Sequence, residues 1–180
     1  MGKVFVHATV TLDGFMADSQ GGMDWMFGFD IVDKDMEAVK KVIDEIGAIV
    51  GGANETRTIE EGELPYGGSL KVPVYLMTHE AHEPVEKDGV TYSFVVDDIA
   101  AAVEAAKADA GDKSVSLLGG SISRQCLKLG LVDEIHLHVV PVLLGQGIAL
   151  FGGLDTRITL ERLHTAAYAS ETHMHYRVVR

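Results

Sequence analysis

Two glycine pairs in this chain follow short apolar segments and suit the binding of a phosphate group. Residues 115–118 and 48–50 predict buried parallel strands, which run into Gly119-Gly120-Ser121 and Gly51-Gly52-Ala53-Asn54. The serine and the asparagine that end these motifs are expected to cap the helices that follow. A helix N-terminus offers free backbone N–H groups, and glycine lets a phosphate approach the backbone closely. Two such turns could therefore hold two parts of one dinucleotide at the carboxyl ends of the strands.

Neither motif matches the G-x-G-x-x-G fingerprint, so an ordinary Rossmann domain is disfavoured. A strand–Gly-Gly–helix turn can also serve packing alone, and this alternative stays open for both motifs. The glycine pairs therefore indicate a phosphate site only together with other features of the chain.

Two pairs of histidines stand two residues apart, His136 with His138 and His173 with His175. This spacing places both members of a pair on one face of a strand. If the two strands pair, four imidazoles gather, and a metal site comes into consideration. Because no carboxylate or cysteine accompanies them at a recognisable spacing, we predict no metal. We expect the histidines on an exposed or subunit-facing surface.

The composition predicts one globular domain over residues 1–180, since 47% of the residues are hydrophobic. Lysine and arginine number 15 against 27 acidic residues, and the net charge of −12 excludes the basic face of a nucleic-acid-binding protein. The apolar runs are too short to span a bilayer, and the first residues lack the features of a signal peptide. The single cysteine, Cys126, excludes an internal disulfide. We therefore expect a cytoplasmic protein without nucleic-acid or membrane partners.

Strand and helix patterns alternate along the first two thirds of the chain. Asp33 and Asp97 are expected N-caps, and Gly47 is expected to end the first of the helices. That helix should bury Met36 with the apolar residues that follow at helical spacing. The predicted strands lie at 3–11, 48–50, 72–78, 91–96 and 115–118, and the predicted helices at 33–46, 54–59, 97–110 and 121–129. Three later strand patterns, at 134–144, 158–169 and 173–179, have no helix between them. The chain is therefore predicted to be an α/β protein with a parallel sheet and antiparallel strands at its C-terminal edge.

Several short motifs occur in one order along nearly the whole chain. They are Val10-Thr11-Leu12-Asp13-Gly14-Phe15-Met16-Ala17, Asp24-Trp25, Ile49-Val50-Gly51-Gly52, Leu118-Gly119-Gly120-Ser121, Asp133-Glu134-Ile135 and Pro141-Val142-Leu143-Leu144-Gly145-Gln146-Gly147. Together they resemble the dihydrofolate-reductase-like superfamily, and most closely the reductase domain of riboflavin biosynthesis and its stand-alone relatives. The resemblance implies a three-layer α/β/α domain with a mixed, mostly parallel sheet of about eight strands.

The resemblance also implies NADPH as the hydride donor, with NADH not excluded, and a heteroaromatic or sugar-phosphate substrate beside the nicotinamide. Carried over onto this sequence, the adenosine would lie near Thr78 and His79, and Ala8 and Ala17 would line the nicotinamide pocket. The pyrophosphate would be held by Gly119, Gly120, Ser121 and Ile122 and, from the other side, by Gly51, Gly52, Ala53 and Asn54.

Trp25 and Asp30 have the spacing of the pocket tryptophan and acid of true dihydrofolate reductases. A buried carboxylate at Asp30 could hydrogen-bond the substrate ring and assist protonation of the atom beside the hydride acceptor. Asp30 or Asp33 can equally be only the cap of the next helix. Asp13, in the Leu-Asp-Gly turn of the riboflavin branch, either contacts the substrate as a catalytic residue or forms an Asx turn.

The chain also departs from the family pattern. Gly52 stands where typical dihydrofolate reductases have a basic residue for the 2′-phosphate of NADPH, so Arg57 or His79 would have to replace it. Arg124 and Lys128 are candidates for binding a substrate phosphate, although both also fit a solvated helix face. Because the related riboflavin reductases form dimers, the resemblance implies a homodimer.

These features predict a single-domain NAD(P)H-dependent reductase of a small substrate, related to 5-amino-6-(5-phosphoribosylamino)uracil reductase. Trp25 and Asp30 keep dihydrofolate reductase activity as an alternative. The missing basic residue after Gly51 keeps a second alternative, a non-catalytic nucleotide-binding or sensing module. Turnover distinguishes an enzyme from such a module.

Overall fold

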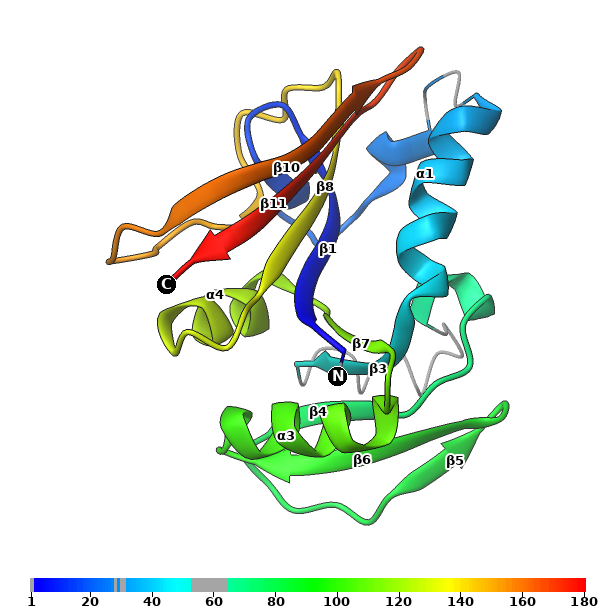
Figure 1. Cartoon of the computed structure of the whole chain (residues 1–180), viewed down its shortest axis with the longest axis vertical. Coiled ribbons are helices and arrows are strands. Elements are labelled where there is room, and N and C mark those ends of the chain that lie inside the picture. The colour runs from blue at the N-terminus through cyan, green and yellow to red at the C-terminus, as the bar shows by residue number, and fades with distance from the viewer. Residues whose placement is uncertain (1, 28, 30–31, 53–64) are drawn as a thin grey trace.

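The computed structural model describes residues 2–27, 29, 32–52 and 65–180 (Figure 1). The helices are η1 (Asp24–Phe27), α1 (Asp33–Asp44), η2 (Pro65–Gly68), α3 (Ile99–Ala110) and α4 (Gly120–Lys128). The strands are β1 (Val4–Thr11), β2 (Phe15–Ala17), β3 (Ile46–Gly51), β4 (Val74–Thr78), β5 (Val85–Lys87), β6 (Val90–Val96), β7 (Ser114–Leu117), β8 (Glu134–Val140), β9 (Ile148–Ala149), β10 (Thr159–Ala167) and β11 (Thr172–Val179).

Nine strands form one sheet in the order β10-β11-β8-β1-β7-β3-β4-β6-β5, and β2 pairs with β9 in a small second sheet. Five neighbouring pairs of the large sheet are parallel, namely β8–β1, β1–β7, β7–β3, β3–β4 and β4–β6. The strands β10 and β11 extend the sheet in antiparallel fashion beyond β8. The mixed, mostly parallel sheet with antiparallel C-terminal strands confirms the predicted fold class, although β8 itself is parallel to β1.

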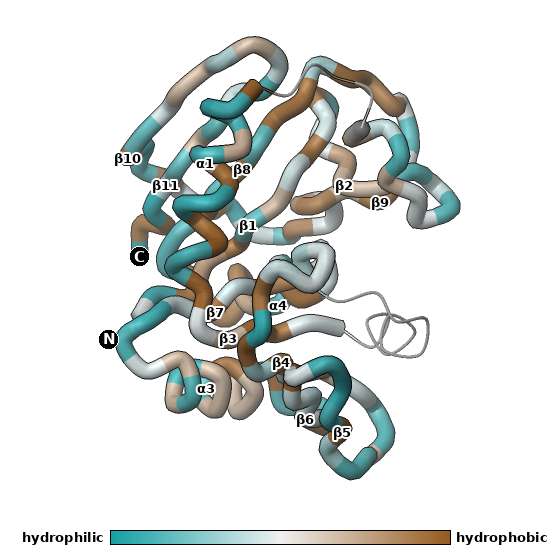
Figure 2. The backbone as a smooth tube through the Cα atoms, turned by 90° about the vertical axis from the view of Figure 1, so that its right-hand side faces the viewer, coloured by the Kyte–Doolittle hydropathy of each residue, from teal (hydrophilic) through white to brown (hydrophobic). Residues whose placement is uncertain are grey.

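Helices cover both faces of the sheet and create two hydrophobic cores (Figure 1). On one face α3 and α4 pack on residues such as Val6, Val50 and Leu117. On the other face α1 contributes Val42 to a core that contains Phe5. Figure 2 shows hydrophobic residues along the central strands β7 and β3. Three layers therefore result from the alternation of side chains along strands that are buried on both faces.

Local helix boundaries differ from the predictions in two places. The helix α1 includes Asp33 as its first residue and ends at Asp44, so neither Asp33 as N-cap nor Gly47 as terminator is correct. Met36 is 59% exposed, so the buried face of α1 is also rotated from the predicted one. The N-cap of α3 is Asp98 and not Asp97, because the Asp98 side chain accepts a hydrogen bond from the Ala101 N–H.

The strand β5 was not predicted, since its three residues carry no apolar pattern. It pairs with β6 in antiparallel fashion at one end of the sheet. Among the described residues, no helix has the length and the apolar character needed to cross a bilayer. Asn54 as a helix cap lies outside the described residues.

Candidate active site

The two glycine turns lie side by side at the carboxyl ends of adjacent strands. The strands β3 and β7 are parallel neighbours, with Val50 opposite Leu117, and the Leu118 N–H donates to the Val50 carbonyl at 2.9 Å. Both strands therefore release their glycine pairs at the same edge of the sheet. A Cβ atom built on Gly52 would lie 3.5 Å from Ile122 Cγ1, in the first turn of α4. The two turns, whose glycine pairs stand 68 positions apart in the sequence, thus meet at the N-terminus of α4.

The helix α4 begins at Gly120, and its N-cap is Gly119, which has a φ of 85°. Glycine has no side chain that could accept from the first N–H groups of the helix, so these groups point outward beyond the sheet edge. Ser121 does not cap this helix, because it lies inside the first turn and its hydroxyl bonds the Gln125 side chain at 3.2 Å. The predicted capping role of Ser121 is therefore wrong, and the anion-binding geometry comes from the glycines alone.

Gly120 is needed for packing as well as for any ligand. A Cβ atom there would lie 2.7 Å from Arg124 Nη1 and 3.1 Å from the Ala149 carbonyl oxygen. Arg124 Nη1 itself donates to the carbonyl oxygens of Ala149 and Leu150. Because Arg124 holds β9 in this way and Lys128 pairs with Asp155 at 3.0 Å, both basic residues already have structural partners.

Thr78 and His79 end β4 at the same edge of the sheet. The Thr78 hydroxyl donates to the Glu80 carbonyl, so it serves its own turn. His79 is largely exposed, and its Nδ1 lies 2.6 Å from the Asp97 carboxylate. A 2′-phosphate at His79 would therefore compete with Asp97 for the imidazole proton.

Ala17 and Ala8 occupy different environments. Ala17 is buried in β2 opposite Ile148 of β9, and its carbonyl lies where a side chain on Gly147 would be. Ala8 packs against the hydrophobic core on the α3 and α4 face of the sheet.

Trp25 lies in η1, and among the described residues its buried indole N–H has no hydrogen-bond partner. The sites predicted at Asp30, Ala53, Asn54 and Arg57 lie outside the described residues.

Asp13 anchors a loop. Its carboxylate accepts a hydrogen bond from the Thr11 hydroxyl at 2.6 Å and from the backbone N–H groups of Leu144 and Gly145 at 3.3 and 2.8 Å. The Thr11 hydroxyl, followed by the backbone N–H of Gly145, holds the pKa of Asp13 below its ordinary value. Acid catalysis needs a pKa near the working pH, so proton donation by Asp13 does not fit this geometry.

Three histidines meet on the sheet face that α1 covers. The register places His7 of β1, His138 of β8 and His173 of β11 on that face. His7 Nε2 lies 2.7 Å from His138 Nε2, and His138 Nδ1 lies 2.6 Å from His173 Nδ1. His173 Nε2 lies 2.8 Å from Asp35 Oδ1 on α1. All four side chains are buried. His136 is buried as well and His175 is half-buried, which corrects the prediction that the histidines of β8 and β11 lie on an exposed or subunit-facing surface.

The same series of hydrogen bonds continues at its other end. His7 Nδ1 lies 3.1 Å from the Tyr66 hydroxyl, which lies 2.9 Å from the Ser116 hydroxyl on β7. The rings of His7 and Tyr66 also stack, with their centroids 5.6 Å apart. We call the six residues Ser116, Tyr66, His7, His138, His173 and Asp35 the imidazole chain. It crosses four adjacent strands of the sheet.

The direction of every hydrogen bond in the imidazole chain follows from Asp35. Its Oδ2 accepts from the Val32 N–H at 3.1 Å, and its Oδ1 accepts from His173 Nε2. A neutral imidazole has one N–H and one lone pair. For a neutral His173, Nδ1 accepts from His138 Nδ1, and His138 Nε2 accepts from His7 Nε2. The next two donors are the hydroxyls of Tyr66 and Ser116, so all bonds point toward Asp35.

The electrostatics agree with this arrangement. Burial, assisted by nearby His136, lowers the pKa of His7 to about 3. Burial and the neighbouring histidines lower the pKa of His138 to about 2. Burial raises the pKa of Tyr66 to about 12. At neutral pH these imidazoles are therefore uncharged and the phenol keeps its proton, as a directed series of hydrogen bonds requires.

Comparison with known proteins identifies the family. The sequence profile of the RibD C-terminal domain matches residues 68–174, which is more than half of the 180 residues. The chain belongs to the RibD C-terminal domain family. The uncharacterized protein YyaP of Bacillus subtilis is 29% identical over 181 residues, covering 93% of this chain and 90% of YyaP.

Solved structures share the fold of this RibD C-terminal domain. A protein from Shewanella sp. PV-4 assigned to riboflavin biosynthesis has a TM-score of 0.82 at 22% identity, over 99% of both chains. The deaminase/5-amino-6-(5-phosphoribosylamino)uracil reductase of Thermotoga maritima has a TM-score of 0.69 at 18% identity, over 99% of this chain and 57% of that one. Dihydrofolate reductase from Enterococcus faecalis, solved with NADP(H), has a TM-score of 0.63 at 13% identity, over 98% of this chain and 96% of that one. The dihydrofolate-reductase-like fold is thus confirmed.

Asp35 is the residue of this RibD C-terminal domain that the sequence reasoning missed. It is fully buried on the first turn of α1, whereas the sequence analysis named Asp30 and Asp33 as the acids near the start of this helix. A signal was present, because Asp35 stands seven residues before the buried Val42 and so shares its helix face. A carboxylate at an apolar-face position is a candidate functional group.

We expect acid to destabilise this RibD C-terminal domain below about pH 6.5. In the folded state His7 and His138 resist protonation, and burial likewise lowers the pKa of His136 to about 4, whereas their ordinary value is 6.5. The unfolded chain therefore binds more protons between these values, so stability rises with pH in that range. Each histidine can lower the free energy of unfolding by up to about 1.4 kcal/mol per pH unit as the pH falls from 6.5 toward 4.

Urea unfolding at a series of pH values measures this effect. The variant His138→Gln should show a smaller slope of unfolding free energy against pH, because one buried imidazole is gone. The variant His82→Gln, at an exposed position, should keep the slope of the wild type. An unfolding free energy that does not change between neutral pH and about pH 5 would contradict the assignment of neutral imidazoles.

Proposed function

We propose that this RibD C-terminal domain is an NAD(P)H-dependent reductase that transfers hydride to a small heteroaromatic or sugar-phosphate substrate. The observation that carries the proposal is the meeting of the two glycine turns at the N-terminus of α4. One extended dinucleotide could reach both turns, and the donors there are backbone N–H groups that need no basic side chain. The related reductases, among them 5-amino-6-(5-phosphoribosylamino)uracil reductase, support hydride transfer as the reaction class.

NADPH, when bound, would supply the hydride, and the chain's own residues would hold the two reactants in contact. Gly51, Gly52 and Gly119, with the first turn of α4, would contact the pyrophosphate. Because Gly52 carries no charge, Arg57 or His79 would have to bind the 2′-phosphate and so set the preference for NADPH over NADH. The unpaired indole N–H of Trp25 would donate to an acceptor atom of the substrate.

The imidazole chain would supply the proton that accompanies hydride transfer. Reduction of a C=N or C=O bond needs one proton at the atom beside the hydride acceptor. The hydrogen bonds of the imidazole chain point toward Asp35, so a proton that enters at Ser116 can pass along the buried side chains to the Asp35 carboxylate without water. We therefore propose that Asp35, and not Asp13, receives this proton and acts as the acid.

One specific observation favours a second candidate, a non-catalytic nucleotide-binding or sensing module. His79 is paired with Asp97, and Gly52 offers no cation, so the described part of the edge has no free basic side chain at these two positions. Such a module would bind the nucleotide and oxidise none of it. Dihydrofolate reductase activity is a third candidate, which dihydrofolate in the substrate panel tests.

We also propose a homodimer. The strand β10 forms one end of the sheet, and eight of its nine residues are exposed, Leu160 and Leu163 among them. An exposed edge strand with apolar side chains is a surface for strand pairing. Light scattering would give twice the mass of the chain if the proposal holds. A cytoplasmic location stays a prediction.

The deciding experiment is a titration of the purified protein with NADPH and, separately, with NADH. Quenching of the fluorescence of Trp25, the single tryptophan, and calorimetry give the two affinities. We expect micromolar binding of NADPH, about −8 kcal/mol in free energy. Oxidation of NADPH is then followed with pterin, pyrimidine and sugar-phosphate substrates. Binding without turnover would favour the sensing module, and no binding of either nucleotide would overturn both.

A further inference from the structure

A second group of polar side chains lies beside the imidazole chain but is not part of it. His136 of β8 and His175 of β11 are opposite each other in the antiparallel register, and their rings stack with centroids 4.0 Å apart. Glu134 stands two residues before His136 on the same strand and therefore on the same face. Glu134 and His136 are buried, and His175 is half-buried.

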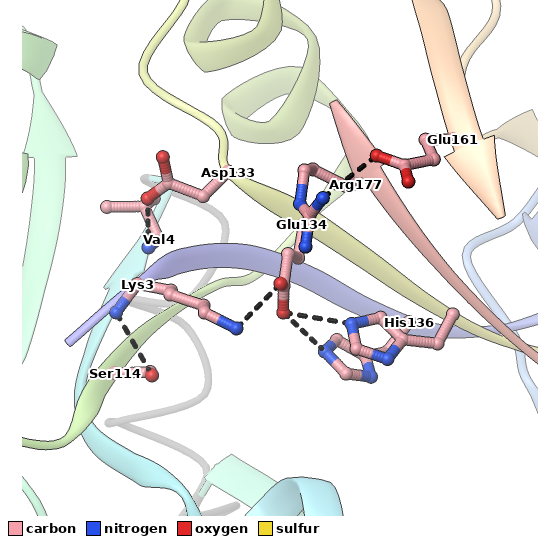
Figure 3. A network of polar contacts seen from close by, with 9 residues as sticks. Lys3, Val4, Ser114, Asp133, Glu134, His136, Glu161 and Arg177 are labelled. Carbon is pink, nitrogen blue, oxygen red and sulfur yellow. Dashed lines mark hydrogen bonds and ion pairs between the residues drawn. The ribbon is translucent and has the colours of Figure 1, made fainter. Parts of the chain in front are cut away.

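The donor atoms of these three side chains converge on one place. Glu134 Oε2 lies 2.9 Å from His175 Nε2 and 3.8 Å from His136 Nε2. Figure 3 shows Glu134 reaching toward His136 on one side and toward Lys3 on the other. All three donor atoms lie within 4.8 Å of one another.

One of these atoms is left without a partner. Among the described residues, His136 Nε2 makes no hydrogen bond, although the side chain is 91% buried, being 9% exposed. A buried nitrogen with no partner costs about 1–3 kcal/mol. It faces the Glu134 carboxylate, which is too distant for a hydrogen bond but near enough to share an ion with it. A buried, unpartnered nitrogen beside a carboxylate is a position at which a ligand can bind.

The separations match those of a tetrahedral metal ion. Bonds of about 2.0–2.1 Å at tetrahedral angles place neighbouring donor atoms about 3.3 Å apart. The observed 2.9 and 3.8 Å lie within about half an ångström of that spacing, so small rotations of the side chains would suffice. We infer that Glu134, His136 and His175 form a binding site for a divalent transition-metal ion such as Zn²⁺.

The charges and the second oxygen of Glu134 suit this site. The Lys3 ammonium lies 2.6 Å from Glu134 Oε1, so it orients the carboxylate with Oε2 toward the two histidines, where Oε2 lies 2.9 Å from His175 Nε2. Burial alone would raise the pKa of Glu134, but hydrogen bonds from Lys3 and His175 hold it below its ordinary value. The carboxylate is therefore negative at neutral pH. Two imidazoles and one carboxylate are an established ligand set for zinc.

The site has room for a further ligand. His136 and His175 line a cavity of about 240 Å³ between α1 and the strands β8, β10 and β11. Three protein ligands leave the fourth tetrahedral position open, as in catalytic zinc sites. That position would be filled by water in the cavity, whose lining carries both charges, with Lys34 and Lys41 beside Glu37 and Glu45. The neighbouring pair His138 and His173 is less suited, because its nitrogens are already used in the imidazole chain.

The test uses the full chain without a purification tag, freed of metal by a chelator and titrated with Zn²⁺ or Co²⁺. We expect one ion per chain, micromolar or tighter, and the visible absorption of tetrahedral Co²⁺. His175→Ala and His136→Ala should weaken Zn²⁺ binding by at least about 100-fold. His164→Ala is the matched control, since His164 lines the same cavity but is exposed and offers no donor to the cluster. It should bind as the wild type does.

His175 lies near the surface, so His175→Ala remains informative even if His136→Ala does not fold. Thermal unfolding gives a second measure, because Zn²⁺ should raise the midpoint of the wild type and of His164→Ala only. No binding of Zn²⁺ by the wild type below about 1 mM would overturn the proposal. So would Zn²⁺ binding that His138→Ala removes and His175→Ala leaves intact. These measurements involve no nucleotide, so they are independent of the reductase assignment.

Discussion

Asp35→Asn is expected to lower the turnover of the reductase about 10²–10⁴-fold while the protein keeps its fold. Asparagine is close to aspartate in shape, and its amide oxygen can still accept from the Val32 N–H. Its amide N–H₂ then faces His173 Nε2 and donates where the carboxylate accepted. The variant therefore removes the carboxylate without removing the hydrogen bonds.

The reversal extends through the imidazole chain. His173 must now carry its proton on Nδ1, so it donates to His138, which in turn donates to His7 from Nε2. His7 Nδ1 then donates to Tyr66, and Tyr66 donates to Ser116. Every member keeps a partner, but all bonds point away from position 35 and no carboxylate remains to exchange a proton. Loss of turnover without loss of stability is the signature of a proton-supply role.

Steady-state kinetics, with the substrate that gives turnover, measure the turnover number of Asp35→Asn. A titration with NADPH measures its affinity for the nucleotide. The turnover number should fall, while the affinity for NADPH stays within about threefold of the wild type. Asp33→Asn is the control, because Asp33 is exposed on the same helical turn. Asp35→Ala should instead unfold more easily by about 1–3 kcal/mol for each buried donor left unpaired. Equal losses of turnover and NADPH affinity in Asp35→Asn would rule out the proton role.

Gly52→Val is expected to weaken NADPH binding at least about 10-fold with little change in stability. Gly52 is not held at a positive φ, and among the described residues a Cβ atom there meets only the Ile122 side chain, at ordinary contact distance. The two γ-methyl groups would fill the space between the glycine turns. A pyrophosphate that bridges the turns could then no longer reach the N-terminus of α4.

Other glycines of the site are poorer choices for this experiment. A side chain on Gly120 would collide with Arg124 and the Ala149 carbonyl, and Gly119 has a φ of 85°. Substitution at either would mix folding with binding. Calorimetry on Gly52→Val should therefore be compared with Gly52→Ala, for which we expect an intermediate loss. Undiminished NADPH affinity in Gly52→Val, with the thermal midpoint unchanged, would contradict the placement of the pyrophosphate.

The local pattern predicted the fold well where one residue type dominates a short segment. Apolar and β-branched residues marked β1 and β6, and the glycine pairs marked the ends of β3 and β7. Helix caps were predicted less well, because Asp97 and Asp98 are chemically alike and only backbone geometry selects Asp98. The short strand β5 gave no pattern at all, since its pairing with β6 stabilises it.

The sequence predicted part of the candidate site, namely the part that depends on spacing along one strand. The equal spacing in the two histidine pairs predicted that the imidazoles would gather if their strands paired, and the register confirms it. Glu134 was missed although it stands two residues before His136 on the same strand, so its spacing was a signal in the sequence. Asp35 was missed because it stands on a helix about a hundred residues away, and motif spacing records only neighbours along one element.

Local patterns along the chain were sufficient to predict the α/β class, the paired glycine turns and the family resemblance, because these depend on residues a few positions apart. The burial of the histidine face beneath α1 became visible only in the folded structure, as did the role of Asp35 as the acid that orients the imidazole chain. Burial and the long-range register set desolvation and proton positions, and both arise only when the distant strands and α1 have packed together.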